Sequence, residues 1–212
     1  MKNLLRIALL AAAAALAGCA VAPDKPQRAT QYDFGPGPAV ALAAAAPAGS
    51  QAPIALSDID ANSALDGTPL LYRLGYADDH QVRPYAHARW SAPVPQLIRQ
   101  RLRERLAQER PVLDLGDSSG LARSRGTLPR TLRLQLEEFS QVFGSPAQSE
   151  GLLRLRATLT DNMPAGERLL AQRSVVVRRP APTPDAAGGV RALAAAVDAA
   201  SEEIAQWLRQ QP

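Results

Sequence analysis

The single cysteine of this 212-residue chain, Cys19, is the residue with the clearest chemical potential, because its thiol directly follows a short apolar segment. Two cations, Lys2 and Arg6, precede that segment, which covers residues 7–17. A cationic start, a short apolar stretch and small residues before a cleavage point are typical of a secretory signal peptide. About eleven apolar residues are too few to span the hydrocarbon core of a bilayer as a helix. The sequence therefore predicts that residues 1–18 are a signal peptide.

The four residues that end at this cysteine, Leu16-Ala17-Gly18-Cys19, resemble the lipobox of bacterial lipoproteins. The resemblance implies that the Cys19 thiol is lipidated, that the chain is cut after Gly18, and that the new amino terminus is acylated, which anchors the protein to a membrane without a spanning helix. The next residue is Ala20 and not an Asp, which in such lipoproteins favours the periplasmic face of the outer membrane. A lone cysteine can also be an ordinary buried residue, but its position after the signal segment favours lipidation.

Ser118 is a second candidate for chemistry, because residues 116–120 match the G-x-S-x-G pattern of a hydrolase nucleophile. That motif needs a strand before it and a helix after it, and residues 121–130 contain Gly and Pro and predict a poor helix. Both histidines also precede Ser118, whereas the hydrolase order places the histidine later. We interpret the run as a Gly/Ser turn and keep a lipid-anchored serine hydrolase as an alternative.

The remaining titratable clusters do not predict an active site. His80 and His87 have only Asp78–Asp79 nearby, whereas a metal site generally needs three or four converging ligands. The neighbours Glu137–Glu138 lie on a predicted strand and would point to opposite faces of it. The chain also lacks a phosphate-binding glycine loop followed by a lysine. We therefore expect no catalytic residues, no cofactor and no metal, and a protein that is not an enzyme.

Composition and net charge limit the classes of partner and the kind of core that the sequence predicts. The formal net charge of +4 includes Lys2 and Arg6, so the mature chain without these two cations carries +2. This excess is too small to predict a nucleic-acid partner, which usually requires a clustered basic surface and a recognisable fold. With Cys19 lipidated no thiol remains for a disulfide, and with only 4% aromatic residues the core must consist mainly of Leu, Val and Ala.

Three segments follow one another along the chain: the signal peptide over 1–18, a lipidated tether and linker over 19–53, and a folded domain over 54–212. Residues 35–53 are rich in Ala, Pro and Gly, a composition that buries too little apolar surface to offset the entropy of ordering. An alanine helix over 39–46 is the competing interpretation.

Apolar periodicity predicts the elements of the domain. Short strands are expected at 32–34, 54–59, 70–74, 81–85 and 112–115. Longer segments with alternating Leu residues, beginning at Leu132 and Leu153, and a less regular one over Leu169–Val177 predict an antiparallel meander with one apolar face.

Two amphipathic helices complete the pattern. The first begins after Ser91, a good N-cap, and carries an apolar stripe from Val94 to Leu106. Its other faces carry arginines that either solvate the helix or meet anionic lipid headgroups or an acidic partner: Arg99, Arg101, Arg103 and Arg105. The second helix is expected from about Asp185 to Gln210. The predicted fold class is α+β, a two-layer sandwich of a mainly antiparallel sheet with two amphipathic helices on one face.

Residues 70–106 resemble the ABC-type transport auxiliary lipoproteins that accompany MCE-domain lipid transporters. The shared pattern is a strand with Tyr72-Arg73, a later Tyr85, then Arg89-Trp90, a proline and an amphipathic helix. The lipobox, the early strands and the closing helix follow in the order that this family shows, so the resemblance covers most of the mature chain. The Ala/Pro linker is longer than is usual for the family.

This resemblance implies a non-enzymatic accessory subunit that binds an MCE-domain protein of an ABC transport system and helps phospholipid or other hydrophobic cargo cross the envelope. It also leaves a homo-oligomer open. Arg89 and Trp90 are the candidate partner contacts, although the favoured interpretation is that Trp90 packs across the sheet–helix junction and Arg89 pairs with a nearby carboxylate. The main alternative is an outer-membrane lipoprotein that regulates a cell-wall or envelope-biogenesis enzyme.

Overall fold

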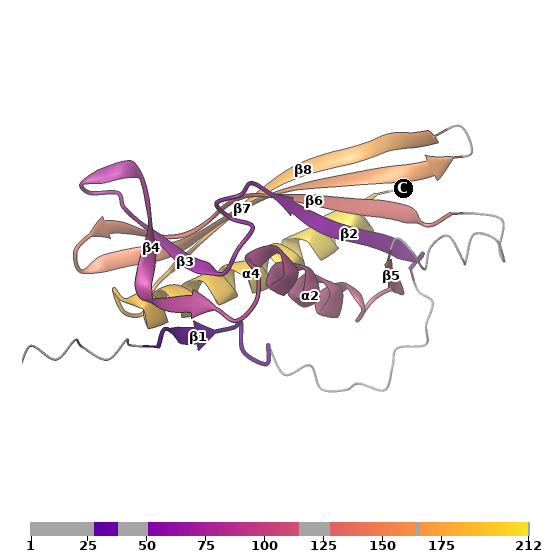
Figure 1. Ribbon diagram of the computed structural model, residues 1–212. Helices are drawn as coiled ribbons and strands as arrows, with labels where there is room; N and C mark the ends of the chain where they lie inside the picture. Colours follow the sequence, from indigo (N-terminus) through magenta and orange to yellow (C-terminus); the bar gives the residue numbers. More distant parts are fainter. Residues whose placement is uncertain (1–27, 38–50, 115–127, 164–165, 212) are drawn as a thin grey trace, which may run out of the picture.

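The computed structural model describes residues 28–37, 51–114, 128–163 and 166–211, which form one sheet covered on one face by two helices (Figure 1). The elements in chain order are β1 (Thr30–Tyr32), β2 (Ile54–Ala61), β3 (Pro69–Leu74), β4 (Asp78–Trp90), α2 (Val94–Leu106), β5 (Val112–Asp114), β6 (Arg130–Ser145), β7 (Gln148–Met163), β8 (Gly166–Pro180) and α4 (Ala186–Arg209). The predicted α+β class, with two layers and both helices on one face, is confirmed.

The sheet is mixed. Antiparallel pairing dominates by length, because β6, β7 and β8 form the predicted meander of long strands. The pairs β1–β4, β2–β5, β2–β6 and β3–β6 are parallel. On the edge opposite β7, the first half of β6 pairs with β2 and its second half with β3.

A register shift in β6 keeps its apolar face turned towards the helices. Leu136 pairs with Leu155, and after the shift Phe139 pairs with Leu153. One extra residue in a strand restores the inward direction of the side chains that follow it. The Leu run and Phe139 therefore share one core, although Phe139 stands an odd number of residues after Leu136.

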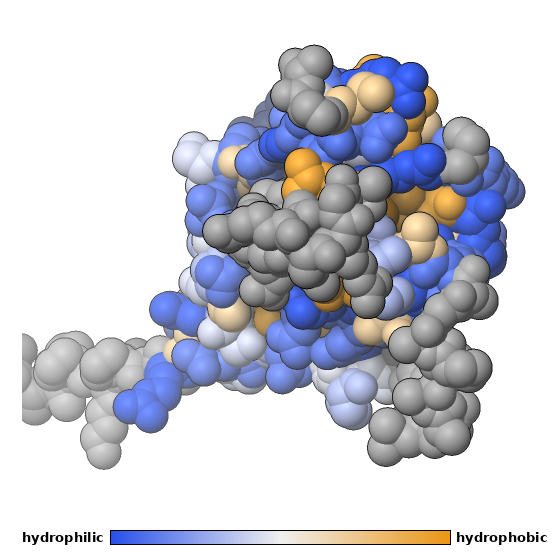
Figure 2. All heavy atoms as spheres, turned by 90° about the vertical axis from the view of Figure 1, so that its right-hand side faces the viewer, coloured by the Kyte–Doolittle hydropathy of each residue, from blue (hydrophilic) through white to orange (hydrophobic). Residues whose placement is uncertain are grey.

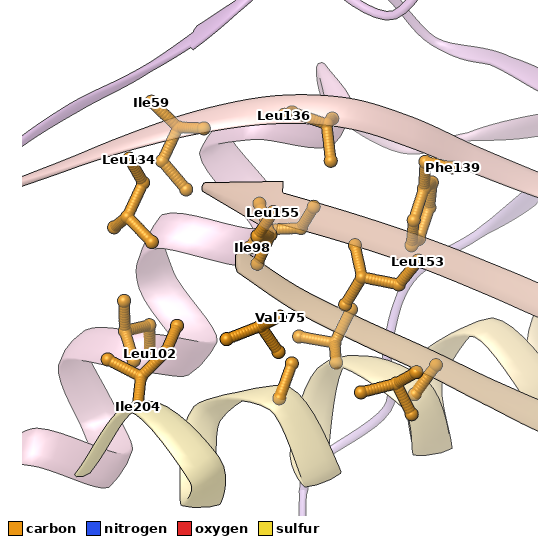
Figure 3. Packing of buried hydrophobic residues seen from close by; sticks show 14 of the residues in the cluster. Ile59, Ile98, Leu102, Leu134, Leu136, Phe139, Leu153, Leu155, Val175 and Ile204 are labelled. Atoms are coloured by element: carbon orange, nitrogen blue, oxygen red, sulfur yellow. The ribbon is translucent and has the colours of Figure 1, made fainter. Parts of the chain in front are cut away.

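The core lies between the sheet and the two helices, where side chains from both layers interdigitate (Figure 3). Leu134 and Leu155 from the sheet meet Ile98 and Leu102 of α2 and Ile204 of α4 there. At about 25 cal/mol per Å² of buried apolar surface, such side chains supply most of the driving force for folding. Among the described residues, no helix combines the length and hydrophobicity needed to cross a bilayer.

Several elements differ in extent from their prediction. The strand expected at 81–85 runs from Asp78 to Trp90, and Pro84 is tolerated because β1 covers only the last three residues of the other edge of β4. The N-cap of α2 is Pro93 and not Ser91, since prolines preset the first turn and no side chain caps it. The expected start of α4 near Asp185 is confirmed, and this residue is its N-cap: the Asp185 carboxylate accepts a hydrogen bond of 2.7 Å from the Gly188 N–H.

The folded unit also begins earlier than residue 54. β1, within the segment expected to be tether, pairs in parallel with the end of β4 and lies beside it at the end of the molecule where α4 begins (Figure 1). The sequence interpretation stopped at the low-complexity run and so placed the boundary after it. Cys19, the signal peptide 1–18 and the Ser118 turn lie outside the described residues.

The end of the molecule where β8 begins is mostly hydrophilic (Figure 2). Exposed large apolar side chains near this end include Leu128, Met163 and Leu169.

Candidate functional site

The predicted partner residues Arg89 and Trp90 lie where the tether joins the domain. Gln31 and Tyr32 of β1 pair with Arg89 and Trp90 of β4. The Ser91 N–H donates a hydrogen bond of 2.7 Å to the Tyr32 carbonyl. The backbone that precedes α2 therefore holds the first strand.

Three aromatic rings fix the chain immediately after β1. Phe34 meets Trp90 with ring centroids 5.2 Å apart and planes inclined by 74°. Phe139 lies 6.0 Å from Phe34 and 5.6 Å from Trp90. Edge-to-face aromatic pairs add to the gain from burial. Trp90 is only 1% exposed, so its indole is a core side chain that receives Phe34.

A buried arginine holds the backbone of the same segment. Nη2 of Arg101, on α2, donates hydrogen bonds of 2.7 and 2.8 Å to the carbonyls of Phe34 and Gly35. Its Nη1 lies 3.5 Å from Oδ1 of Asp198 on α4, and the arginine side chain is 7% exposed. Burial raises the pKa of the Asp198 carboxyl, while the Arg101 charge opposes that rise.

Gly37 shows how closely the chain crosses this guanidinium. Its φ is +75°, a conformation that favours glycine, and a Cβ on it would lie 2.0 Å from Nη1 of Arg101. We call Phe34, Trp90, Arg101, Phe139 and Asp198 the junction, because they join tether, sheet and both helices.

The other sequence candidates are not drawn into this site. Arg89 is exposed and has no ion pair among the described residues. The ring of His80 is largely exposed, 3.5 Å from Asp79, and His87 is exposed. Within the described ranges, no group of three or more His, Cys, Asp or Glu side chains is arranged to hold a metal ion.

The tyrosines of the resemblance pattern have structural partners. The rings of Tyr72 and Tyr85 lie 4.6 Å apart, and the Tyr85 hydroxyl donates a 2.8 Å hydrogen bond to Oε1 of Gln141. Burial, with smaller contributions from Tyr72 and Asp185, raises the pKa of Tyr85 to about 12. This phenol therefore stays protonated at physiological pH and acts as a hydrogen-bond donor.

The arginines of α2 do not form a free basic face. Arg99 and Arg103 both pair with Asp114, the last residue of β5, and these hydrogen bonds lower the pKa of that carboxyl. Arg105 pairs with Glu109 and Glu202, each at 2.6 Å. The sequence predicted that these arginines either solvate the helix or contact lipid or a partner. In the structure these three instead form ion pairs within the domain.

Sequence reasoning missed Phe34 and Arg101 as a pair. Phe34 was expected in a short strand, and Arg101 was treated as one of four similar arginines. The signal that separates Arg101 from its neighbours is its spacing on the helix, since it alone of the four stands both three residues after Ile98 and four after Leu97. Its partners are backbone carbonyls more than sixty residues away, which no local pattern reveals.

Comparison with known proteins identifies the group to which this architecture belongs. The family described as ABC-type transport auxiliary lipoprotein component matches residues 32–205, a range that includes the junction. The chain belongs to this family. As an ABC-type transport auxiliary lipoprotein it is a component of an ABC transport system, and the family fits a lipid-anchored protein of the cell envelope.

Two solved structures share the fold of this auxiliary lipoprotein. A protein from Xanthomonas campestris matches with a TM-score of 0.61 and 16% identity, covering 76% of this chain and 88% of that one. A second protein, described as uncharacterized, matches with a TM-score of 0.56 and 16% identity, covering 74% of this chain and 92% of its own. No curated protein matches the sequence.

Proposed function

We propose that this auxiliary lipoprotein is anchored through Cys19 at the periplasmic face of the outer membrane and binds an MCE-domain protein of its ABC transport system. In this role it helps phospholipid or other hydrophobic cargo to cross the envelope. The observation that carries the proposal is the family match over residues 32–205, which begins within the tether. The lipobox and the resemblance of residues 70–106 support the finer assignment.

Because the junction fixes the end of the tether to the domain, the length of the tether limits the distance between the domain and the membrane. The chain from Cys19 to Thr30 has eleven residue steps, which extend to at most about 40 Å. β1 is then fixed to β4 by backbone pairing and to the core by Phe34. A lipidated Cys19 therefore keeps β1, where the tether joins the folded domain, within that distance of the membrane.

The protein acts by binding in this proposal and not by catalysis. The neighbouring carboxylates Glu138 and Glu137 form ion pairs with Arg73 and Arg156. Such pairs orient strands and helices. Replacing Ser118 by Ala tests the hydrolase alternative, because a loss of cellular function with retained folding would favour a nucleophile at that position.

The central test is affinity purification of the tagged mature lipoprotein from detergent-solubilised envelopes. We expect an MCE-domain protein to be recovered together with the permease and ATPase subunits of its transporter. Mass spectrometry of the same sample should show acylated Cys19, and a Cys19→Ala variant serves as the control for anchoring. Recovery of a cell-wall enzyme in place of these subunits would overturn the proposal in favour of the regulatory alternative.

A further inference from the structure

Four arginines at one end of the domain form no ion pair with a carboxylate among the described residues, although the charge of Arg191 helps to lower the pKa of Asp185. Arg28, Arg89, Arg179 and Arg191 are exposed. The hydrogen bonds recorded for two of them go to neutral atoms: Arg179 Nη1 to the Arg178 carbonyl, and Arg191 Nη2 to the Thr183 hydroxyl. We call these four residues the arginine end.

Arginines in the rest of the described chain are mostly paired with carboxylates. The pairs include Arg73–Glu138, Arg105–Glu202, Arg133–Glu167, Arg156–Glu137, Arg168–Asp161 and Arg173–Glu203. Paired charges have little long-range field, whereas unpaired ones attract anions from solution. In the described chain the arginine end is therefore a cluster of arginines without ion pairs, whereas Arg83 and Arg154, which also form none, are isolated cases.

The four side chains come from different elements that meet at this end. Arg89 is the register partner of Gln31, and Gln31 and Arg191 both line an open hollow of about 530 Å³. Arg179 pairs with Gly151, whose missing Cβ would lie only 2.7 Å from the Leu193 N of α4. The end of β8, the start of α4 and β1 are thus adjacent, as their places in Figure 1 also show.

Two carboxylates share this end, and both serve the local backbone. Asp33 accepts a hydrogen bond from the Gly35 N–H, and Asp185 caps α4 and accepts from Thr183. Glu150, nearby on β7, pairs with Arg178. The four unpaired arginines therefore still outnumber the unpaired acids, and they have no carboxylate within ion-pair distance in the described chain.

The tether enters at the same end. Arg28 stands nine residues after Cys19, a separation that extends to about 30 Å. An acylated Cys19 thus holds this end, more closely than any other described surface, near the headgroup layer. The attraction between charges and an anionic surface falls off within a Debye length of about 8–10 Å, so the arginines contribute only when this end approaches the bilayer.

We propose that the arginine end faces the membrane and contacts anionic phospholipid headgroups, so that the domain has a preferred orientation on the bilayer. The inference rests on the lipid anchor of the proposed function. An acidic surface of a transporter subunit has similar chemistry, but the length of the tether favours the membrane. The opposite end, where β8 begins, then points into the periplasm.

The test uses the mature lipidated protein in nanodiscs with a single dye-labelled cysteine. Acylated Cys19 does not react, so Gln31→Cys reports on the arginine end and Met163→Cys on the opposite end. A nitroxide attached to lipid headgroups quenches a nearby dye. In nanodiscs containing phosphatidylglycerol we expect the dye at position 31 to be quenched about twofold more than the dye at 163, and the difference to become clearly smaller in pure phosphatidylcholine, where only the tether holds position 31 near the bilayer.

A charge-matched pair of variants isolates the arginines. Arg89→Gln with Arg191→Gln removes two charges from the arginine end and should abolish the preference for anionic lipid. Arg154→Glu makes the same change in net charge on β7, at an exposed position outside the arginine end, and should leave the preference intact. Urea unfolding confirms that all variants fold.

Equal quenching at positions 31 and 163 in anionic nanodiscs would overturn the inference, as would an effect of Arg154→Glu equal to that of the double variant. Protection of position 31 that appears only when transporter subunits are added would overturn it in favour of an acidic protein partner. Mass spectrometry of Cys19 keeps the two proposals separate: a bare thiol contradicts the anchor, whereas acylated protein without oriented quenching contradicts this inference alone.

Discussion

Phe34 packs edge-on against Trp90, with ring centroids 5.2 Å apart and an interplanar angle of 74°. The two residues are separated by more than fifty positions, yet this contact joins the tether to the core. Trp90 is 1% exposed, so the indole cannot release Phe34 without opening a cavity. The folded domain therefore fixes the position of the tether at Phe34.

Replacing Phe34 by Ala should therefore loosen β1 as well as destabilise the domain. We expect the free energy of unfolding to fall by about 2–3 kcal/mol, at the low end for a buried aromatic because Phe34 is only half-buried. Urea unfolding measures this loss, and hydrogen exchange of the Thr30–Tyr32 amides should accelerate more than exchange within β7. The exposed Gln31→Ala provides the control.

Close packing of α4 on β7 leads to a second prediction. A Cβ on Gly151 would lie 2.7 Å from the Leu193 N and 2.8 Å from the Ala192 carbonyl carbon, both backbone atoms that cannot rotate away. Gly151→Ala should therefore lower the free energy of unfolding by about 1–3 kcal/mol. A Cβ on Gly144 would meet nothing within 4 Å, so Gly144→Ala should be close to neutral. Equal effects in thermal unfolding would contradict this packing argument.

The meander and the closing helix could be predicted because their signals are local. Alternating Leu residues mark the inward face of β6 and β7 whatever the rest of the chain does, and Asp185 marks the start of α4. The parallel strand pairs could not be predicted in the same way, since each joins segments separated by a helix or a loop. The register shift near Glu138 was also hidden, because it appears only when β6 is matched to β7.

The candidate site could likewise be predicted only where its signals are local in the sequence. The pattern Arg89-Trp90 drew attention to the correct place in the chain, since both residues border β1. That Trp90 receives Phe34, and that Arg101 binds the backbone carbonyls of Phe34 and Gly35, follows from tertiary packing. Residue type predicts charge and size, whereas the partner of each charge depends on the fold.

An ion-pair cluster between α2 and α4 predicts a loss of stability in acid. Hydrogen bonds from Arg105 and Gln206 hold the pKa of Glu202 below its ordinary value of 4.5. A carboxyl with a lowered folded pKa stabilises the fold above its unfolded pKa and loses that contribution as pH falls through the folded pKa. Stability should thus decline below about pH 4.5 in the native protein, and less steeply in Glu202→Gln.

Chemical unfolding between pH 3 and pH 7 measures this difference. At pH 7 the cost of Glu202→Gln should be only about 0.5–1 kcal/mol, because the carboxylate is half-exposed and solvent screens the pair. Asp60→Asn is the control, since the exposed Asp60 has no ion pair in the described part of the chain. A Glu202→Gln profile that runs parallel to the native one would contradict the assignment.

The pair of Arg101 and Asp198 predicts the opposite dependence on pH once the cation is removed. Arg101→Met should leave the carbonyls of Phe34 and Gly35 without their donor and Asp198 without its counter-charge, at a cost of about 3 kcal/mol at pH 7. Burial already raises the pKa of Asp198 above 3.8, and Arg101 limits that rise. In the Arg101→Met variant, the Asp198 carboxylate therefore binds a proton more readily in the folded chain than in the unfolded chain.

A raised folded pKa of a carboxyl means that stability is highest below its unfolded pKa and falls as pH rises through the folded value. The deficit of Arg101→Met relative to the native protein should therefore grow from pH 3.5 to pH 7. Adding Asp198→Asn removes the titrating group, so the double variant should keep a constant deficit from the lost carbonyl bonds and be more stable at pH 7 than Arg101→Met alone. A double variant less stable than the single one would show that Asp198 supports the junction through another contact, because removing an orphaned charge should otherwise relieve its desolvation.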